Sequence, residues 1–367
     1  MRILGDRLFV LIVTVLILGG LAMFFSASLG LLAREDASLT HIATTQLLLG
    51  LVPGLIALVG IRFMPSKWIA KGTLPFYLLT VFLTMLVFVP GIGVHINGAS
   101  RWINLGFTTL QPGEFLKIGV ILMLGGYLAF AGKSITNIRV GLIPFCIIVG
   151  IPCILLLLEP NTSTVLVLGT TSAVMYFLAG APWRDFAILA LISVIGLAGL
   201  VMTRPYLMDR VQTFIHPSED AFASGYQIQQ SLIAVGSGGF LGRGFGQSVE
   251  KFNYLPEAVN DSVFAVFGEE FGFVGSVFLL LLFVGFATRG FRIASEASTA
   301  AGAHIAVGLT LMIVLSAFLN IGAMLGVLPL TGLPLPFMSH GGTALFASLA
   351  AVGIILNVAG GKRKTMR

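Results

Sequence analysis

Residues 225–275 read GYQIQQSLIAVGSGGFLGRGFGQSVEKFNYLPEAVNDSVFAVFGEEFGFVG, and they join a polar, glycine-rich loop to a long apolar run. Most of the remaining chain consists of apolar runs, whereas eight of its 15 acidic residues lie in this stretch or just before it. Carboxylates at membrane depth are costly unless they have partners or a function. We therefore expect the chemistry of this protein to lie here.

Apolar residues dominate the whole chain. Hydrophobic residues make up 57% of the 367 residues and charged residues 10%, and the mean hydropathy is +1.01. Soluble domains usually contain about 45–50% apolar and about 25% charged residues. Apolar runs of about 20 residues recur, and in lipid such runs satisfy their backbone only as helices. The sequence therefore predicts an all-α fold, a polytopic integral membrane protein that forms a single domain over residues 1–367.

We expect about ten transmembrane helices, because a helix needs about 20 apolar residues to cross the bilayer. The first run is too long for a signal peptide and has no cleavage site, so it should be a retained helix. An even number of spans places both termini on one side. The expected spans are residues 8–28, 41–61, 72–90, 113–131, 139–158, 162–180, 184–203, 263–288, 301–325 and 341–360.

Basic residues predict which side is cytoplasmic. With these spans, 14 of the 21 Lys and Arg residues lie on the side of the termini, six lie on the other side, and Lys117 lies within a span. Cytoplasmic loops carry the excess of Lys and Arg, so both termini should be cytoplasmic and the large loop, at about 204–262, extracytoplasmic. The net charge of +6 is then a topology signal that requires no nucleic acid, and the basic C-terminal tail favours anionic membrane lipids.

Neither a built-in metal site nor a nucleotide site is indicated. Cys146 and Cys153 share a helix face but predict no disulfide or thiolate site, and the five His residues have no ligand spacing. The glycine run at 236–246 is not followed by Gly-Lys-Ser/Thr, and no strand precedes it. It favours either close backbone approach to a lipid head group or a tight re-entrant fold.

Two charged residues lie inside the fourth span. Pro112 suits the first position of a helix, so Glu114 and Lys117 should lie three residues apart on one helix face. Ionisable groups at membrane depth usually face a cavity or each other, which favours a functional site. The alternative is a neutralised pair that only locks two helices together. At the turn between spans five and six, we interpret Asn161 or Thr162 as a helix cap.

Asp261 precedes the eighth span, a position that suits either a helix N-cap or a catalytic carboxylate. Glu269 and Glu270 fall one or two turns inside that span and need cationic partners. Gln227 and Ser231 lie on a short, half-apolar stretch that suits an interfacial helix. The uncharged segment 326–346, rich in Pro and Gly, should form a wall of the site or a hinge. The cations available on this side as partners are Arg101, Arg204, Arg210, Arg243 and Lys251.

Several motifs resemble, in order and spacing, the FtsW/RodA/SpoVE family of shape, elongation, division and sporulation (SEDS) proteins. They are GASRWINLG with QPGEFLK, GYQIQQSLIAVGSGGFLGRGFG, LPEAVNDSVFAVFGEEFGFVG and TGLPLPFMSHGGTA. The resemblance covers essentially the whole chain. It implies the SEDS fold of ten helices, with a large extracytoplasmic loop between helices seven and eight, in the bacterial cytoplasmic membrane.

The resemblance also implies an activity and partners. Family members are peptidoglycan glycosyltransferases that polymerise lipid II, an undecaprenyl-pyrophosphate-linked disaccharide peptide, into glycan strands. They work alongside a class B penicillin-binding protein and other divisome or elongasome membrane proteins. The motif GLPLPF is similar to the elongation type and GEEFG to the division type, so both roles stay open. Two further alternatives are a lipid II flippase, which would use Glu114 and Lys117 as a charge relay, and a scaffold that recruits the penicillin-binding protein.

Matching the motifs residue by residue, the essential loop aspartate of the family is Asp261. The Glu and Lys of its fourth helix are Glu114 and Lys117, and its Arg-Trp pair is Arg101 and Trp102. The chain departs from the family pattern at four places. They are Val259-Asn260 in place of His-Thr, Gly113 in place of Ser, Asn161 in place of Asp, and His340 in place of Tyr.

An enzyme facing outward has no ATP, so its donor must carry its own leaving group, as lipid II does. We assign Asp261 as the base that takes the proton from the acceptor hydroxyl in an inverting displacement. A divalent cation, Mg²⁺ or Mn²⁺, is a candidate to share the binding of the pyrophosphate, without a built-in metal site and without a nucleotide. The predicted substrate-binding residues are Arg101, Glu114, Lys117, Arg210, Gln227, Ser231, Arg243, Lys251 and Glu257.

Overall fold

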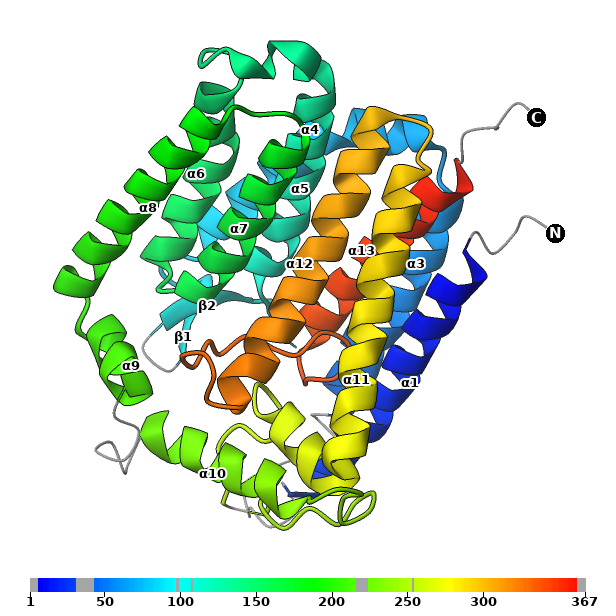
Figure 1. Cartoon of the computed structure of the whole chain (residues 1–367), viewed down its shortest axis with the longest axis vertical. Helices are drawn as coiled ribbons and strands as arrows, with labels where there is room; N and C mark the ends of the chain where they lie inside the picture. The colour runs from blue at the N-terminus through cyan, green and yellow to red at the C-terminus, as the bar shows by residue number, and fades with distance from the viewer. Residues whose placement is uncertain are drawn as a thin grey trace.

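Ten apolar helices make up the membrane part of the computed structural model, which describes residues 6–30, 43–96, 99–106, 108–215, 224–252 and 254–361 (Figure 1). Eight spans are long and apolar enough to cross a bilayer, while α6 and α7 are shorter apolar helices. One of the eight is Thr45–Phe63, which α3 forms together with the π-helix η2 (Thr45–Leu51). The ten match the expected spans in order. They are α1 (Arg7–Leu29), α3 (Val52–Phe63), α4 (Ser66–Leu86), α5 (Pro112–Ala131), α6 (Leu142–Leu158), α7 (Thr162–Leu178), α8 (Trp183–Thr203), α11 (Val263–Ser295), α12 (Ala300–Met324) and α13 (Gly342–Gly360).

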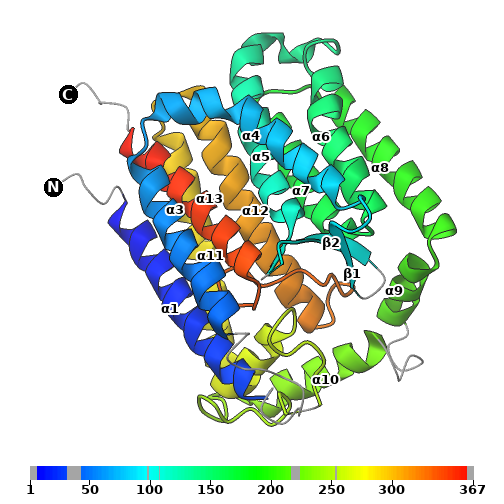
Figure 2. The same cartoon turned by 180° about the vertical axis from the view of Figure 1, so that it is seen from behind.

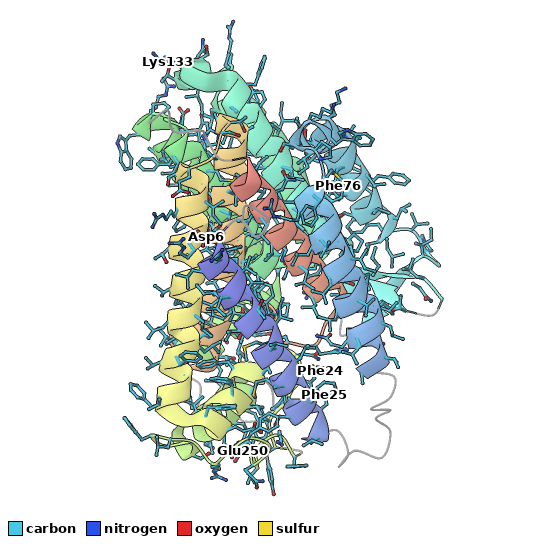
Figure 3. All side chains as sticks on the ribbon, turned by 90° about the vertical axis from the view of Figure 1, so that its right-hand side faces the viewer. Asp6, Phe24, Phe25, Phe76, Lys133 and Glu250 are labelled. Carbon is cyan, nitrogen blue, oxygen red and sulfur yellow. The ribbon has the colours of Figure 1, made fainter. Side chains whose placement is uncertain are left out.

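The two ends of the bundle differ. α1 begins and α13 ends at the same end, as the even number of spans predicts (Figures 1 and 2). The opposite end carries the two helices of the large loop, α9 (Pro205–Ile215) and α10 (Ser224–Ser237). Figure 3 shows this polarity with two labelled side chains, since Lys133 lies at one end of the molecule and Glu250 at the other.

The first long loop contains strands that the all-helical prediction lacks. β1 (Gly93–Ile96), β2 (Ala99–Asn104) and β3 (Thr109–Leu110) form an antiparallel sheet in the order β1-β2-β3. By pairing with one another, the strands provide hydrogen-bond partners for the backbone groups of this loop. The sheet fixes β2 beside the start of α5.

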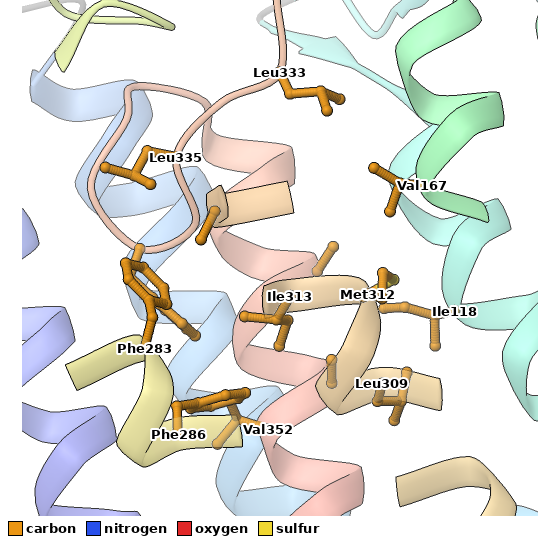
Figure 4. Packing of buried hydrophobic residues seen from close by; sticks show 14 of the residues in the cluster. Ile118, Val167, Phe283, Phe286, Leu309, Met312, Ile313, Leu333, Leu335 and Val352 are labelled. Carbon is orange, nitrogen blue, oxygen red and sulfur yellow. The ribbon is translucent and has the colours of Figure 1, made fainter. Parts of the chain in front are cut away.

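The interior of the bundle lies around α5, α12 and α13, whose side chains are the most buried of the long helices. Figure 4 shows Leu309, Met312 and Ile313 of α12 packed between side chains of the surrounding helices. Because lipid tails are as apolar as these side chains, close packing rather than the hydrophobic effect holds such helices together. The segment from Leu333 to Leu335, between α12 and α13, caps this packed interior on the side of α10.

In contrast, α8 stands at the edge of the bundle (Figure 1). Residues 191–199 are all exposed, as expected of a helix that faces lipid. Its first turn is held to α7, where Tyr176 donates a hydrogen bond of 2.6 Å to Asp185 and Phe177 packs on Trp183 and Phe186. α8 leads directly into α9.

α11 is two helices joined at a break. Gly272 has φ 64° and ψ −161°, which are not helical, and the glycine run of the large loop lies against the break. A Cβ at Gly272 would lie 2.3 Å from the amide nitrogen of Gly242, so only glycine allows this approach. The loop amides of Arg243 and Gly244 donate to the carbonyls of Glu269 and Glu270, at 3.0 and 2.9 Å.

The amides beyond the break are satisfied in the same way. Those of Phe273 and Val274 donate to the carbonyls of Gly239 and Phe240, at 2.9 and 3.1 Å. The glycine run therefore completes the hydrogen bonding of a broken helix. The close backbone approach that the glycines were expected to allow is made with α11.

Candidate active site

A cleft of about 710 Å³ opens at the end of the bundle that carries the large loop. The sheet and the start of α5 form one wall, and the segment between α12 and α13 forms another. The residues from Glu257 to Asp261, just before α11, close it. Its polar lining includes Arg101, Gln111, Glu257, Asn260, Asp261 and His340.

Asp261 is held in this cleft by a tight turn. The carbonyl of Glu257, which has a φ of 51°, accepts hydrogen bonds from the amides of Asn260 and Ser262, at 2.9 and 3.2 Å. The side chain of Gln227 donates to Asp261 at 3.5 Å and to Ser262 at 2.9 Å. The N-cap of α11 is Ser262, so the capping alternative for Asp261 was wrong.

The surroundings of Asp261 raise its pKa to about 6. Burial of the carboxyl group is the largest cause, and the nearby charge of Glu257 adds to it. The hydrogen bond from Gln227 and the charge of Arg210 act in the opposite direction on this pKa. Asp261 is therefore ionised at neutral pH and still basic enough to accept a proton near that pH.

Arg210 of α9 approaches the same point from the large loop. A Cβ added at Gly332 would lie 3.8 Å from Oδ2 of Asp261 and 4.0 Å from Nη2 of Arg210. The carboxylate and the guanidinium thus both approach the segment between α12 and α13 at Gly332, whose φ of 63° favours glycine. This arrangement places an acid group and a cation close to the same point.

Arg101 lines the opposite wall from strand β2, next to Trp102. Its guanidinium donates a hydrogen bond of 3.2 Å to the carbonyl of Glu159 and a second one to the carbonyl of Pro160. These bonds fix the side chain to the turn between α6 and α7 while it faces the cleft. A guanidinium held in this way is suited to bind a diphosphate.

The side chain of Glu159, behind Arg101, is fully buried. Neither of its carboxylate oxygens has a hydrogen-bond partner among the residues that the structure describes. Burial raises the pKa of Glu159 to about 8, and the charge of Arg101 reduces this shift. Asn161 begins α7 as its N-cap residue, as predicted, although its side chain makes no cap hydrogen bond.

Replacing Glu159 with Gln should change how stability depends on pH. The pKa of about 8 in the folded protein lies above the ordinary value of 4.5, so the native state keeps a proton that the unfolded state loses. The stabilising contribution of protonated Glu159 to the free energy of unfolding should be fully present below about pH 4.5 and be lost as pH rises towards about 8. Thermal unfolding in detergent should show Glu159→Gln equal to the parent at pH 5 and more stable at pH 9. Parallel melting profiles would contradict this, and Glu296→Gln, at an exposed ion pair, is the control.

Glu114 and Lys117 form an ion pair of 2.9 Å on α5, and their side chains are 7% and 6% exposed. They line a small internal cavity of about 20 Å³, large enough for a single water molecule, and not the main cleft. Pro334 and Ala344 contribute to both cavities, so one thin wall separates them. The structure therefore places the pair directly behind the cleft.

Removing one member of this pair should destabilise the protein more than removing both. A single alanine at Glu114 or Lys117 leaves an uncompensated buried charge, whereas the double change to Gln and Met leaves none. Thermal unfolding of the three variants measures the coupling. Additive losses in the double variant would show that the two side chains do not interact.

Three of the nine predicted substrate-binding residues lie away from Asp261, from the cleft and from the small cavity behind it. Arg243 pairs with Glu269 at 3.2 Å, Lys251 pairs with Glu270 at 2.8 Å, and Ser231 is buried against Met324. Glu269 and Glu270 therefore have the cationic partners that their position requires, and these cations are used to hold the loop on α11. The structure does not bring Arg243, Lys251 or Ser231 to Asp261. Arg210 and Gln227 lie beside Asp261, whereas Arg101 and Glu257 line the same cleft.

The sequence interpretation missed one contact between two departures from the family pattern. Nδ1 of His340 lies 3.3 Å from Oδ1 of Asn260, whose amide group donates to the carboxylate of Glu257. The amide of His340 also donates to the carbonyl of Val259. The residues at these two departures, Val259-Asn260 and His340, thus form one hydrogen-bonded wall beside Asp261. Asn320 was missed as well, although a lone Asn in the apolar run LMIVLSAFLNIGAML is a detectable signal.

Comparisons with known proteins agree with this architecture. The family model of FtsW, RodA and SpoVE, described as cell cycle protein, matches residues 6–364. The chain is 39% identical to stage V sporulation protein E of Bacillus subtilis, over 96% of both chains. It is also 39% identical to a probable peptidoglycan glycosyltransferase FtsW of Thioalkalivibrio sulfidiphilus, over 92% of this chain and 85% of that protein.

Two solved structures are similar over nearly the full length. One belongs to a study of a peptidoglycan synthase complex that coordinates polymerization and crosslinking, with a TM-score of 0.79 and 29% identity over 98% of this chain and 99% of that chain. The other is the rod shape determining protein RodA of Thermus thermophilus, with a TM-score of 0.66 and 25% identity over 98% of both chains.

Proposed function

Because this chain belongs to the FtsW/RodA/SpoVE family and is a multi-pass membrane peptidoglycan glycosyltransferase, we propose that it polymerises lipid II in the cleft, with Asp261 as the general base. The observation that carries this proposal is the position of Asp261, which lines the cleft opposite Arg101 and approaches Arg210 at Gly332. A flat surface or a scaffold needs no such arrangement.

The proposed step is a direct displacement. The hydroxyl oxygen of the acceptor sugar attacks the anomeric carbon of the donor, and Asp261 takes the hydroxyl proton. The new glycosidic bond forms as the bond from the anomeric carbon to the diphosphate oxygen breaks, with inversion. Arg101 and Arg210 stabilise the negative charge that develops on the departing diphosphate.

A divalent cation belongs to this proposal only as part of the substrate complex. Asp261 and Glu257 are the carboxylates that line the cleft, and the oxygen ligands that Mg²⁺ prefers would otherwise come from the diphosphate. Because Asp261 must accept the proton of the acceptor hydroxyl, Glu257 would hold the ion near the leaving group. In that place it would add to the charge stabilisation that the two arginines give.

The test is direct. Purified protein is mixed with lipid II, with and without a class B penicillin-binding protein as the proposed partner enzyme, and glycan chain length is measured. We expect strands longer than the starting disaccharide, with more product when the partner is present. Lipid II that is moved between leaflets of a vesicle but never polymerised would support the flippase alternative instead.

We also propose that the cleft is extracytoplasmic and that both termini are cytoplasmic, from the excess of Lys and Arg at the end of the bundle opposite the cleft. Single cysteines are introduced at Tyr254, in the exposed loop, and at Lys133, at the opposite end, after Cys146 and Cys153 are replaced. In intact cells, a membrane-impermeant maleimide should label the cysteine at 254 and not the one at 133. The reverse pattern would contradict this orientation.

A further inference from the structure

Asn320 is a buried polar residue near the C-terminal end of α12, with 1% of its surface exposed. Its side-chain nitrogen, Nδ2, lies 2.7 Å from the carbonyl oxygen of Asp261 and 2.7 Å from the carbonyl oxygen of Leu333. One amide group thus donates to two main-chain carbonyls from different parts of the chain. Asn320 does not line the cleft.

The two acceptors belong to the two walls between which the proposed reaction takes place. Asp261 precedes α11, while Leu333 lies in the segment that joins α12 to α13. Next to Leu333 is Gly332, the point at which the Asp261 carboxylate and the Arg210 guanidinium converge. Asn320 therefore ties the main chain of Asp261 to the segment at Leu333, next to the glycine that Arg210 approaches.

We propose that Asn320 is a positioning residue for glycosyl transfer, holding Asp261 at the wall formed by 332–333 so that its carboxylate stays aligned with the acceptor and Arg210. This inference rests on the proposed function. A buried polar group is costly unless it is hydrogen-bonded, and the side-chain nitrogen of Asn320 donates to both carbonyls. A displacement of about 1 Å at a reacting group lowers rates by as much as about 100-fold.

The test compares Asn320→Leu with Ser316→Ala. Leu has the same branched arrangement of side-chain heavy atoms as Asn but donates no hydrogen bond. Ser316 lies one turn earlier on α12 and is also buried, and among the described residues its hydroxyl bonds to the carbonyl of Met312 in its own helix. In lipid II polymerisation we expect kcat of Asn320→Leu to fall about 10- to 100-fold with KM within about threefold, and Ser316→Ala to match the parent.

A second readout separates positioning from general destabilisation. With its main chain released, Asp261 should become more solvated, so the acidic fall in kcat should move from near pH 6 towards lower pH. Asn320→Ser, whose hydroxyl reaches one carbonyl at a time, should lose less activity than Asn320→Leu. It also provides a folded variant if Asn320→Leu does not fold.

Each outcome decides the inference. It is overturned if kcat of Asn320→Leu, or of Asn320→Ser when the leucine variant is unfolded, stays within twofold of the parent. It is equally overturned if kcat falls with an unchanged pH profile and a matching loss of melting temperature. If the parent and Ser316→Ala make no glycan either, the proposed function has failed, and the role of Asn320 fails with it.

Discussion

Asp261→Asn lowers lipid II polymerisation by about 100-fold or more while the protein stays folded, if Asp261 is the general base. The amide has nearly the same shape as the carboxyl group and can accept the hydrogen bond from Gln227, but it cannot take a proton. The raised pKa means that the ionised carboxylate is itself unfavourable in the folded state at pH 7. The Asn variant should therefore melt at the same temperature as the parent or slightly higher.

The measurement is polymerisation and thermal unfolding on the same preparation, with Asp209→Asn, a change in the same loop, as the control. Parent activity should also fall as pH drops through about 6, where Asp261 becomes protonated. The pH dependence of stability runs in the opposite direction to that of activity. The contribution of Asp261 to the free energy of unfolding should be greatest below its ordinary pKa of 3.8 and should fall as pH rises through about 6. Near-normal glycan synthesis by the Asn variant would remove Asp261 from the chemistry.

Lys251→Met should destabilise the protein by about 3–5 kcal/mol, the usual effect of breaking a buried ion pair. Both side chains of the Lys251–Glu270 pair are fully buried. The Lys251 ammonium group also donates to Ser26 at 3.0 Å and to the carbonyl of Gly246 at 2.8 Å. The substitution leaves Glu270 buried and uncompensated, and it removes the contact that joins α1, the large loop and α11.

Two comparisons check the cause of this loss. Lys251→Met combined with Glu270→Leu should recover most of the stability, because no buried charge is left. Arg243→Met should cost less than Lys251→Met, because the Arg243 side chain is 40% exposed and water takes part in solvating Glu269 when the pair is broken. Chemical denaturation in detergent measures all three. A double variant as unstable as Lys251→Met would show that packing, and not charge, is responsible.

The sequence predicts the membrane helices well because lipid leaves a long apolar run no alternative to a helix. It does not predict the sheet that carries Arg101, because β1, β2 and β3 are short and their pairing depends on turns without a strong local signal. The site is predictable only in part. Arg210 and Lys251 are both cations in the large loop, and nothing in their spacing separates the one that faces Asp261 from the one that is buried against Glu270.

The broken helix has a consequence for how the protein meets bilayers of different thickness. α11 has 33 residues, whereas about 20 suffice to cross the hydrocarbon core, and the break at Gly272 separates 263–271 from 273–295. A helix that mismatches its bilayer tilts, and an unbroken α11 would carry Asp261 with it. Here the glycine loop bonds to both sides of the break, and residues 273–295 alone are long enough to cross the hydrocarbon core. The segment 263–271, next to Asp261, therefore stays at the cleft and does not extend the membrane span.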